Sequence, residues 1–132
     1  MAKTKFTTEY EINASSKMLY PYLSSSSGLA DWFADKVILE PDKVTYNFIW
    51  DGKAHKARKA SQKINQYVKF EFLPEKESDK KDLSYIEFKI DSNELTQTSF
   101  LRIIDYSEIE DPKDSKEMWN NLLTNLKVIV GG

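Results

Sequence analysis

Few residues in this sequence could carry acid–base chemistry. The chain has no cysteine and one histidine, His55, so thiol catalysis, disulfides and histidine-rich metal centres are excluded. His55 stands among lysines just after a hairpin signal, which is typical of a solvated histidine. Tyr46, Tyr85 and Asp105 are the other candidate acids or bases. None has the spacing of a nucleophile–base pair, so an enzyme is less favoured than a binding protein, and we assign no catalytic residue and no metal ligand.

Arg102 is one of two arginines and lies in the apolar run "FLRIID". If its side chain points into the interior, it needs a carboxylate from a ligand or from the protein, because a buried charge must be paired. If it points outward, it would lie beside Glu87 or Lys89. We include Arg102 among the predicted ligand-binding residues, which makes its orientation an expectation that a structure can test.

Composition excludes several classes of protein. A chain of 132 residues, 40% hydrophobic and 13% aromatic, can build a core and is expected to form a single domain over residues 1–132. A net charge of −2 gives no overall attraction to nucleic acid, and the basic run 53–63 is better explained as a sheet edge guarded by lysines. No segment has the composition of a signal peptide or a membrane span. We therefore expect a cytoplasmic protein with no membrane insertion, no nucleic-acid partner and no cofactor.

The elements that would position these residues follow from hydrophobic periodicity. Alternation in "FTTEYEIN" predicts a first strand with one buried face. Two short helices follow, the first capped by Ser15 or Ser16 and shortened or kinked by Pro21, the second capped by Ser27. The period then becomes two, and six or seven antiparallel strands are expected in total, the later ones over 36–40, 44–50, 53–62, 67–73, 83–90 and 95–108.

The last segment changes period again. Apolar residues from Met118 to Val130 recur at helical spacing, which predicts a helix of about four or five turns with a wide apolar stripe. Asp114 and Glu117 have the offset of a capping box, and Gly131 is expected to end the helix. Because a strand meander with one apolar face must cover that face, we expect the sheet to curl around this helix and to leave a space lined by aromatic side chains.

Three stretches together resemble the START-like superfamily, which has the helix-grip fold, and within it the branch related to the activator of heat-shock protein ATPase. They are "EYEINASSKMLYPYLSSSSGLADWFADKV", "VTYNFIWDGKAHKA" and "MWNNLLTNLKVIV", in the family's order and spanning almost the whole chain. The resemblance implies an α+β fold with a curved antiparallel sheet around a long C-terminal helix. It also implies a cavity that binds a small apolar or amphipathic molecule. Fold alone does not settle function, because activity depends on the residues of the cavity.

From alternation and this resemblance we predict a lipid-like ligand between sheet and helix. The predicted ligand-binding residues are Trp32, Phe33, Tyr46, Phe48, Trp50, Phe70, Phe72, Phe88, Arg102, Trp119, Leu123 and Leu126. The alternative is that these side chains simply fill the core. A second alternative is a protein-interaction or chaperone-cofactor-like module, with a homodimer as one form. It rests on "LRIIDY", which is apolar on both faces, and on Val128, which lies off the main stripe.

Overall fold

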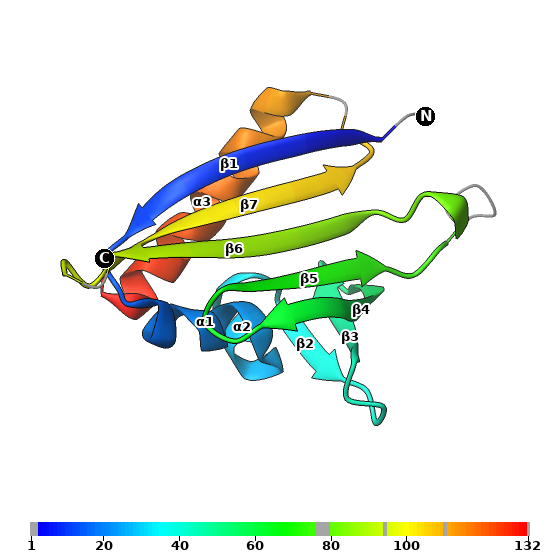
Figure 1. The fold of residues 1–132 in the computed structure, drawn as a ribbon. Coiled ribbons are helices and arrows are strands. Elements are labelled where there is room, and N and C mark those ends of the chain that lie inside the picture. Colours follow the sequence, from blue (N-terminus) through cyan, green and yellow to red (C-terminus); the bar gives the residue numbers. More distant parts are fainter. Residues whose placement is uncertain (1–2, 76–79, 94, 110, 132) are drawn as a thin grey trace.

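A computed structural model describes residues 3–75, 80–93, 95–109 and 111–131. Within these ranges, seven strands form one antiparallel sheet in the order β1-β7-β6-β5-β4-β3-β2 (Figure 1). The strands are β1 Thr4–Ile12, β2 Lys36–Leu39, β3 Thr45–Trp50, β4 Lys53–Lys63, β5 Tyr67–Phe72, β6 Tyr85–Asn93 and β7 Thr98–Ser107. The helices are α1 Ser16–Ser24, α2 Ser26–Trp32 and α3 Pro112–Val130. The prediction of six or seven strands in an α+β fold, with two short helices after the first strand and a long helix at the end, is confirmed.

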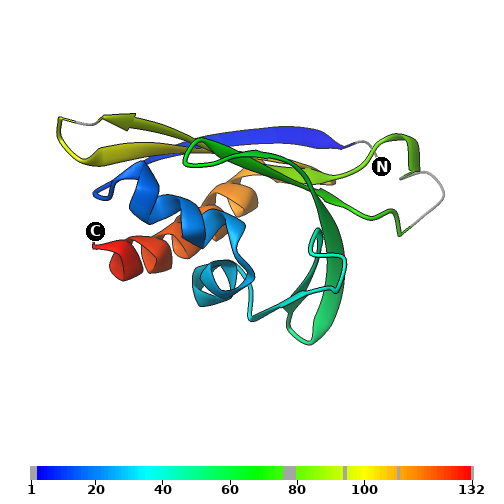
Figure 2. The ribbon, with the colours of Figure 1, turned by 60° about the horizontal axis from the view of Figure 1, so that its bottom comes forward.

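The sheet is strongly bent, and the helices lie on its concave side (Figure 2). We call the concave, helix-covered side the inner face and the opposite side the outer face. Helix α3 packs against β1, and α2 contacts both α3 and β2. Two side-chain hydrogen bonds fasten α3 to β1: Lys116 donates to Thr8 Oγ1 over 2.8 Å, and Tyr10 donates to Asn120 Oδ1 over 2.7 Å. The predicted helix-grip arrangement is confirmed.

The turn and cap residues explain where several elements begin and end. Asp51 and Gly52 both have positive φ, 50° and 77°, as a two-residue hairpin turn between β3 and β4 requires. Gly131, with φ 106°, ends α3 in the left-handed conformation as predicted. The capping box predicted at Asp114 is wrong, because Asp111 is the cap and its side chain accepts from the Lys113 N–H.

The connection between α1 and α2 is unusually tight. Ser25, rather than the predicted Ser27, caps α2, and its hydroxyl accepts from the Gly28 N–H over 3.0 Å. Gly28 packs directly on α1, because a Cβ there would lie 2.3 Å from the Pro21 carbonyl oxygen. Trp32 Nε1 donates to the Tyr22 carbonyl over 2.7 Å. These contacts hold the two short helices together and fix the start of the segment that carries Phe33.

Candidate functional site

A pocket of about 490 Å³ opens between the bent sheet and the first half of α3. Its deep end is formed by the buried side chains of Phe33 and Trp119, and α3 adds Met118 and Leu122 nearer to solvent. Most of the wall is apolar. The full lining is Phe33, Trp50, His55, Phe72, Ser84, Tyr85, Ile86, Asp105, Tyr106, Ser107, Met118, Trp119 and Leu122. A largely apolar hollow with a few polar groups is the usual form of a small-molecule site.

Phe33 organises the deep end of the pocket. It immediately follows α2, and its ring lies within 5.2–5.8 Å of the rings of five other aromatic residues, centroid to centroid. The ring stacks on that of Trp119, from α3, and meets that of Trp50, from β3, edge to face. Trp50 Nε1 also donates to the Phe33 carbonyl over 2.8 Å. The adjacent aromatics Trp32 and Phe33 thus join α2 to the sheet and to α3, and Phe33 also borders the pocket.

Asp105 is the buried charged group of the pocket. It lies on β7 with its side chain on the inner face, and the residue is 7% exposed. One carboxylate oxygen accepts from the Ser107 hydroxyl over 2.9 Å, and the other accepts from Trp119 Nε1–H over 3.1 Å. Burial raises the pKa of Asp105 above its ordinary value, although both hydrogen bonds act in the opposite direction. The pocket therefore combines aromatic walls with a partly desolvated carboxyl group.

The rim of the pocket is more polar. The His55 ring lies 5.5 Å from the Trp50 ring, and His55 Nδ1 is 3.5 Å from Glu75 Oε1. At the end of β7, the Tyr106 hydroxyl donates to Asp82, and this hydrogen bond raises the pKa of Tyr106. These groups stand where the polar part of a bound molecule would meet solvent.

The structure divides the predicted ligand-binding residues into two groups. Phe33, Trp50, Phe72 and Trp119 line the pocket. The others on the inner side are packed in the core and do not line it: Trp32, Tyr46, Phe48, Phe70, Phe88, Leu123 and Leu126. For this second group, filling the core is the better description. The ligand-binding role of the first group stays a prediction.

Arg102 was included among the ligand-binding residues with its orientation left open, and the structure places it outside the pocket. Its side chain lies on the outer face, 56% exposed, with Nη2 3.3 Å from Glu9 Oε2 on the neighbouring strand β1. Leu101 and Ile103 on either side are fully buried on the inner face, so strand alternation places Arg102 outside.

Several lining residues were missed as ligand contacts, but the sequence carried some signal for them. His55, Tyr85 and Asp105 were considered as acid–base candidates. Met118 and Leu122 belonged to the predicted apolar stripe of α3, yet Met118 is exposed and Leu122 only partly buried. Incomplete burial of apolar residues on a core-facing helix is the feature that marks the pocket. Nothing in the sequence singled out Ser84, Ile86 or Ser107.

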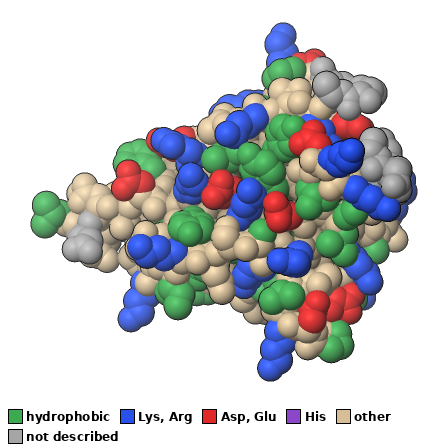
Figure 3. All heavy atoms as spheres, turned by 45° about the vertical axis from the view of Figure 1, so that its right-hand side comes forward, with side chains coloured by type: hydrophobic (Ala, Val, Ile, Leu, Met, Phe, Trp, Pro, Cys, Tyr) green, Lys and Arg blue, Asp and Glu red, His purple; other side chains and the backbone are tan. Residues whose placement is uncertain are grey.

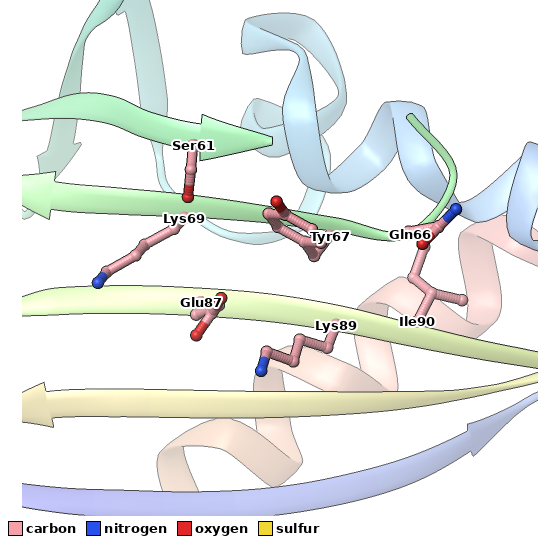
Figure 4. A pocket seen from close by; sticks show the side chains of 7 residues that line it. All are labelled: Ser61, Gln66, Tyr67, Lys69, Glu87, Lys89 and Ile90. Carbon is pink, nitrogen blue, oxygen red and sulfur yellow. The ribbon is translucent and has the colours of Figure 1, made fainter. Parts of the chain in front are cut away.

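The outer face carries a second, shallow hollow of about 440 Å³ over β5 and β6 (Figure 4). Its wall is about equally polar and apolar and includes Lys69, Glu87 and Lys89. The ammonium group of Lys69 lies 4.2 Å from the centre of the Tyr85 ring, so this cation already has a partner. On the side that Figure 3 presents, Lys and Arg side chains are interspersed with Asp and Glu, and neither sign forms a continuous patch. We therefore take the inner pocket as the candidate site.

The residues in the described part of the chain also bear on metal binding and membrane crossing. No group of three or more His, Asp or Glu residues within it could hold a metal ion. None of the helices described there is long and apolar enough to cross a membrane.

The bent sheet, the gripped helix and the pocket between them define a helix-grip protein. Residues 1–132 match the family model of the START-like superfamily domain, and the chain belongs to this superfamily. Comparison with curated proteins finds no match.

Solved structures with the same fold include three from bacteria. The Aha1 dimer from Colwellia psychrerythraea is 18% identical over 96% of both chains, with a TM-score of 0.77. XoxI from Bacillus cereus is 14% identical over 98% of this chain and 96% of that one, with a TM-score of 0.74. A START superfamily protein from Mycobacterium smegmatis is 12% identical over 96% of both, with a TM-score of 0.70. At these identities the similarity establishes a shared fold.

Proposed function

We propose that this protein binds a small hydrophobic or amphipathic molecule in the pocket between the sheet and α3. The observation that carries the proposal is the aromatic hollow of about 490 Å³, whose wall contains a buried carboxyl group. Its volume is in the range of small-molecule sites. Membership of a superfamily with this fold supports the proposal. We further propose that residues 1–132 act as one domain, located in the cytoplasm.

The first experiment is native mass spectrometry of the freshly purified protein, followed by titration with Nile red, a neutral hydrophobic dye. A mass increment of a few hundred daltons that organic solvent removes would support a ligand-carrying pocket and reveal the chemical class of its content. For the protein after solvent extraction, we expect saturable Nile red binding with one site per chain.

Two variants locate the site, and one controls for general hydrophobicity. Leu122→Trp fills the space beside α3 and is expected to weaken Nile red binding, whereas Phe72→Ala enlarges the hollow and is expected to change the dye's affinity or emission. Phe100→Ala is the matched control, because Phe100 is also partly exposed but lies on the outer face. If Leu122→Trp binds as the unmodified protein does, or if Phe100→Ala has the larger effect, the dye does not occupy this pocket and the proposal fails.

A protein-interaction or chaperone-cofactor-like role, with a homodimer as one form, is the alternative. It is favoured by the 79% exposure of Val128 on α3 and by the dimeric form of the similar Aha1 structure. The second apolar face of "LRIIDY" supports it less, because Ile104 is buried and the partly buried Tyr106 stacks on Tyr85. Sedimentation velocity over a hundredfold range of concentration tests the homodimer. A concentration-dependent size that Val128→Lys abolishes would support it, and a constant monomer would exclude it.

A further inference from the structure

The pocket has a negatively charged group as well as an apolar wall. Its lining contains one buried acid, Asp105, and neither lysine nor arginine among the described residues. Arg102, whose orientation the sequence left open, pairs with Glu9 on the outer face. A ligand anion in the hollow would therefore lie close to a carboxylate with no lysine or arginine in the wall to offset the repulsion, and like charges at close range in a poorly solvated site disfavour binding.

The carboxylate of Asp105 has acceptor capacity left. Its two oxygens offer about four lone-pair positions in total. Ser107 and Trp119 each donate one hydrogen bond to it, one per oxygen, and it has no other hydrogen-bond partner among the described residues. Both partners hold the group in place, because Trp119 is fully buried on α3 and Ser107 follows Asp105 on the same strand. A hydrogen-bond donor that enters the pocket can therefore bind to a carboxylate whose position is already fixed.

The rim does not reverse this preference. The imidazole of His55 belongs to the lining, and its Nδ1 faces the Glu75 carboxylate at 3.5 Å. Any positive charge on the imidazole is therefore compensated by a carboxylate beside it. With Asp82, which accepts from the Tyr106 hydroxyl, the site and its rim present three carboxylates, and Asp105 lies at the buried end. The described lysine at this rim is Lys3, which donates to the Asp82 backbone carbonyl.

From this arrangement, and resting on the function proposed above, we propose that the pocket selects amphipathic amines. The apolar body would lie against Phe33, Phe72 and Trp119, and the ammonium group would donate hydrogen bonds to Asp105. Amphipaths that end in a carboxylate or phosphate are rejected by the same side chain. A hydrogen bond between two charged groups is stronger than one between neutral groups, so an alcohol of equal length should bind with intermediate affinity.

The test compares three probes of one chain length, 1-decylamine, 1-decanol and decanoate, each below its micelle concentration at pH 7.5. Each is titrated as a competitor of Nile red and, where affinity permits, by calorimetry. We expect decylamine to bind at least about tenfold more tightly than decanoate, with decanol between them, as a single charge-assisted hydrogen bond warrants. Asp105→Asn keeps the shape and an acceptor oxygen but removes the charge, and should reduce the ratio to about threefold or less. Glu75→Gln removes a rim charge and should leave most of the preference in place.

Salt provides a control that needs no variant and remains informative if Asp105→Asn does not fold. A preference set by a buried carboxylate should persist in 0.5 M NaCl, whereas one set by surface charge should be lost through screening. Equal binding of the three probes, tighter binding of decanoate, loss of the preference in salt, or its retention in folded Asp105→Asn would each overturn the inference while leaving the pocket as a binding site. If neither Nile red nor any of the probes binds, the proposed function itself fails.

Discussion

Replacing Phe33 by alanine should remove the centre of the aromatic cluster. Phe33 is 3% exposed, and its ring is within 5.8 Å of five other aromatic rings. Truncating a buried phenylalanine costs about 3–5 kcal/mol, and each aromatic pair adds about 0.5–1.5 kcal/mol beyond simple burial, though not additively. We therefore expect the free energy of unfolding to fall by about 4 kcal/mol. This is a large part of the roughly 5–15 kcal/mol typical of folded domains.

Urea unfolding followed by far-ultraviolet circular dichroism measures this loss. With a slope of about 2 kcal/mol per molar urea, the unfolding midpoint should fall by about 2 M. Phe33→Leu retains part of the contact and should lie between Phe33→Ala and the unmodified protein. Phe100→Ala, on the outer face, should change stability by no more than about 1 kcal/mol. If Phe33→Ala and Phe100→Ala shift the midpoint equally, the cluster does not hold the sheet, α2 and α3 together as we argue.

Three further predictions concern other parts of the molecule. Burial raises the pKa of Asp105 in the folded state, so the native protein still holds the proton that the unfolded chain releases near the ordinary pKa of 3.8. The free energy of unfolding, measured relative to Asp105→Asn, should therefore fall as the pH rises from about 4 and then level off. Parallel curves of urea midpoint against pH for the two proteins would contradict this. Gly28→Ala should lower stability by about 1–3 kcal/mol in thermal unfolding, because the new methyl group would meet the Pro21 carbonyl oxygen, and an unchanged melting temperature would mean that the α1–α2 contact yields easily. Asp111→Ala should cost about 1 kcal/mol through loss of the α3 cap, whereas Glu117→Ala should cost less than about 0.5 kcal/mol; the reverse order would restore the capping box suggested by the sequence.

Strand faces could be predicted from the sequence wherever polar and apolar residues alternate. Tyr46 and Phe48 on β3, and Val68 and Phe70 on β5, are buried as the period of two requires. On β7 the run of apolar residues hides the period. The inward position of Leu101 and the outward position of Arg102 are therefore visible only in the pairing of the strands.

The pocket could not be located from the same pattern. Phe48 and Phe72 both point to the inner face, yet Phe48 is fully buried and Phe72 lines the pocket. Alternation tells which face a side chain occupies, but not how close α3 comes to that point of the strand. The distance between sheet and helix depends on the bend of the sheet and on the aromatic cluster around Phe33, which brings together elements distant in the sequence.

The position of β1 at the edge of the sheet has a consequence for the order in which the chain can fold. Within the described sheet its one neighbouring strand is β7, with Thr4 opposite Ser107 and Ile12 opposite Ser99. During synthesis β1 is made before β7, and the two partners are separated by about a hundred residues of chain. Pairing over so long a separation is entropically costly and slow. The nascent chain must therefore keep an unpaired strand in solution until β7 and then α3 have emerged.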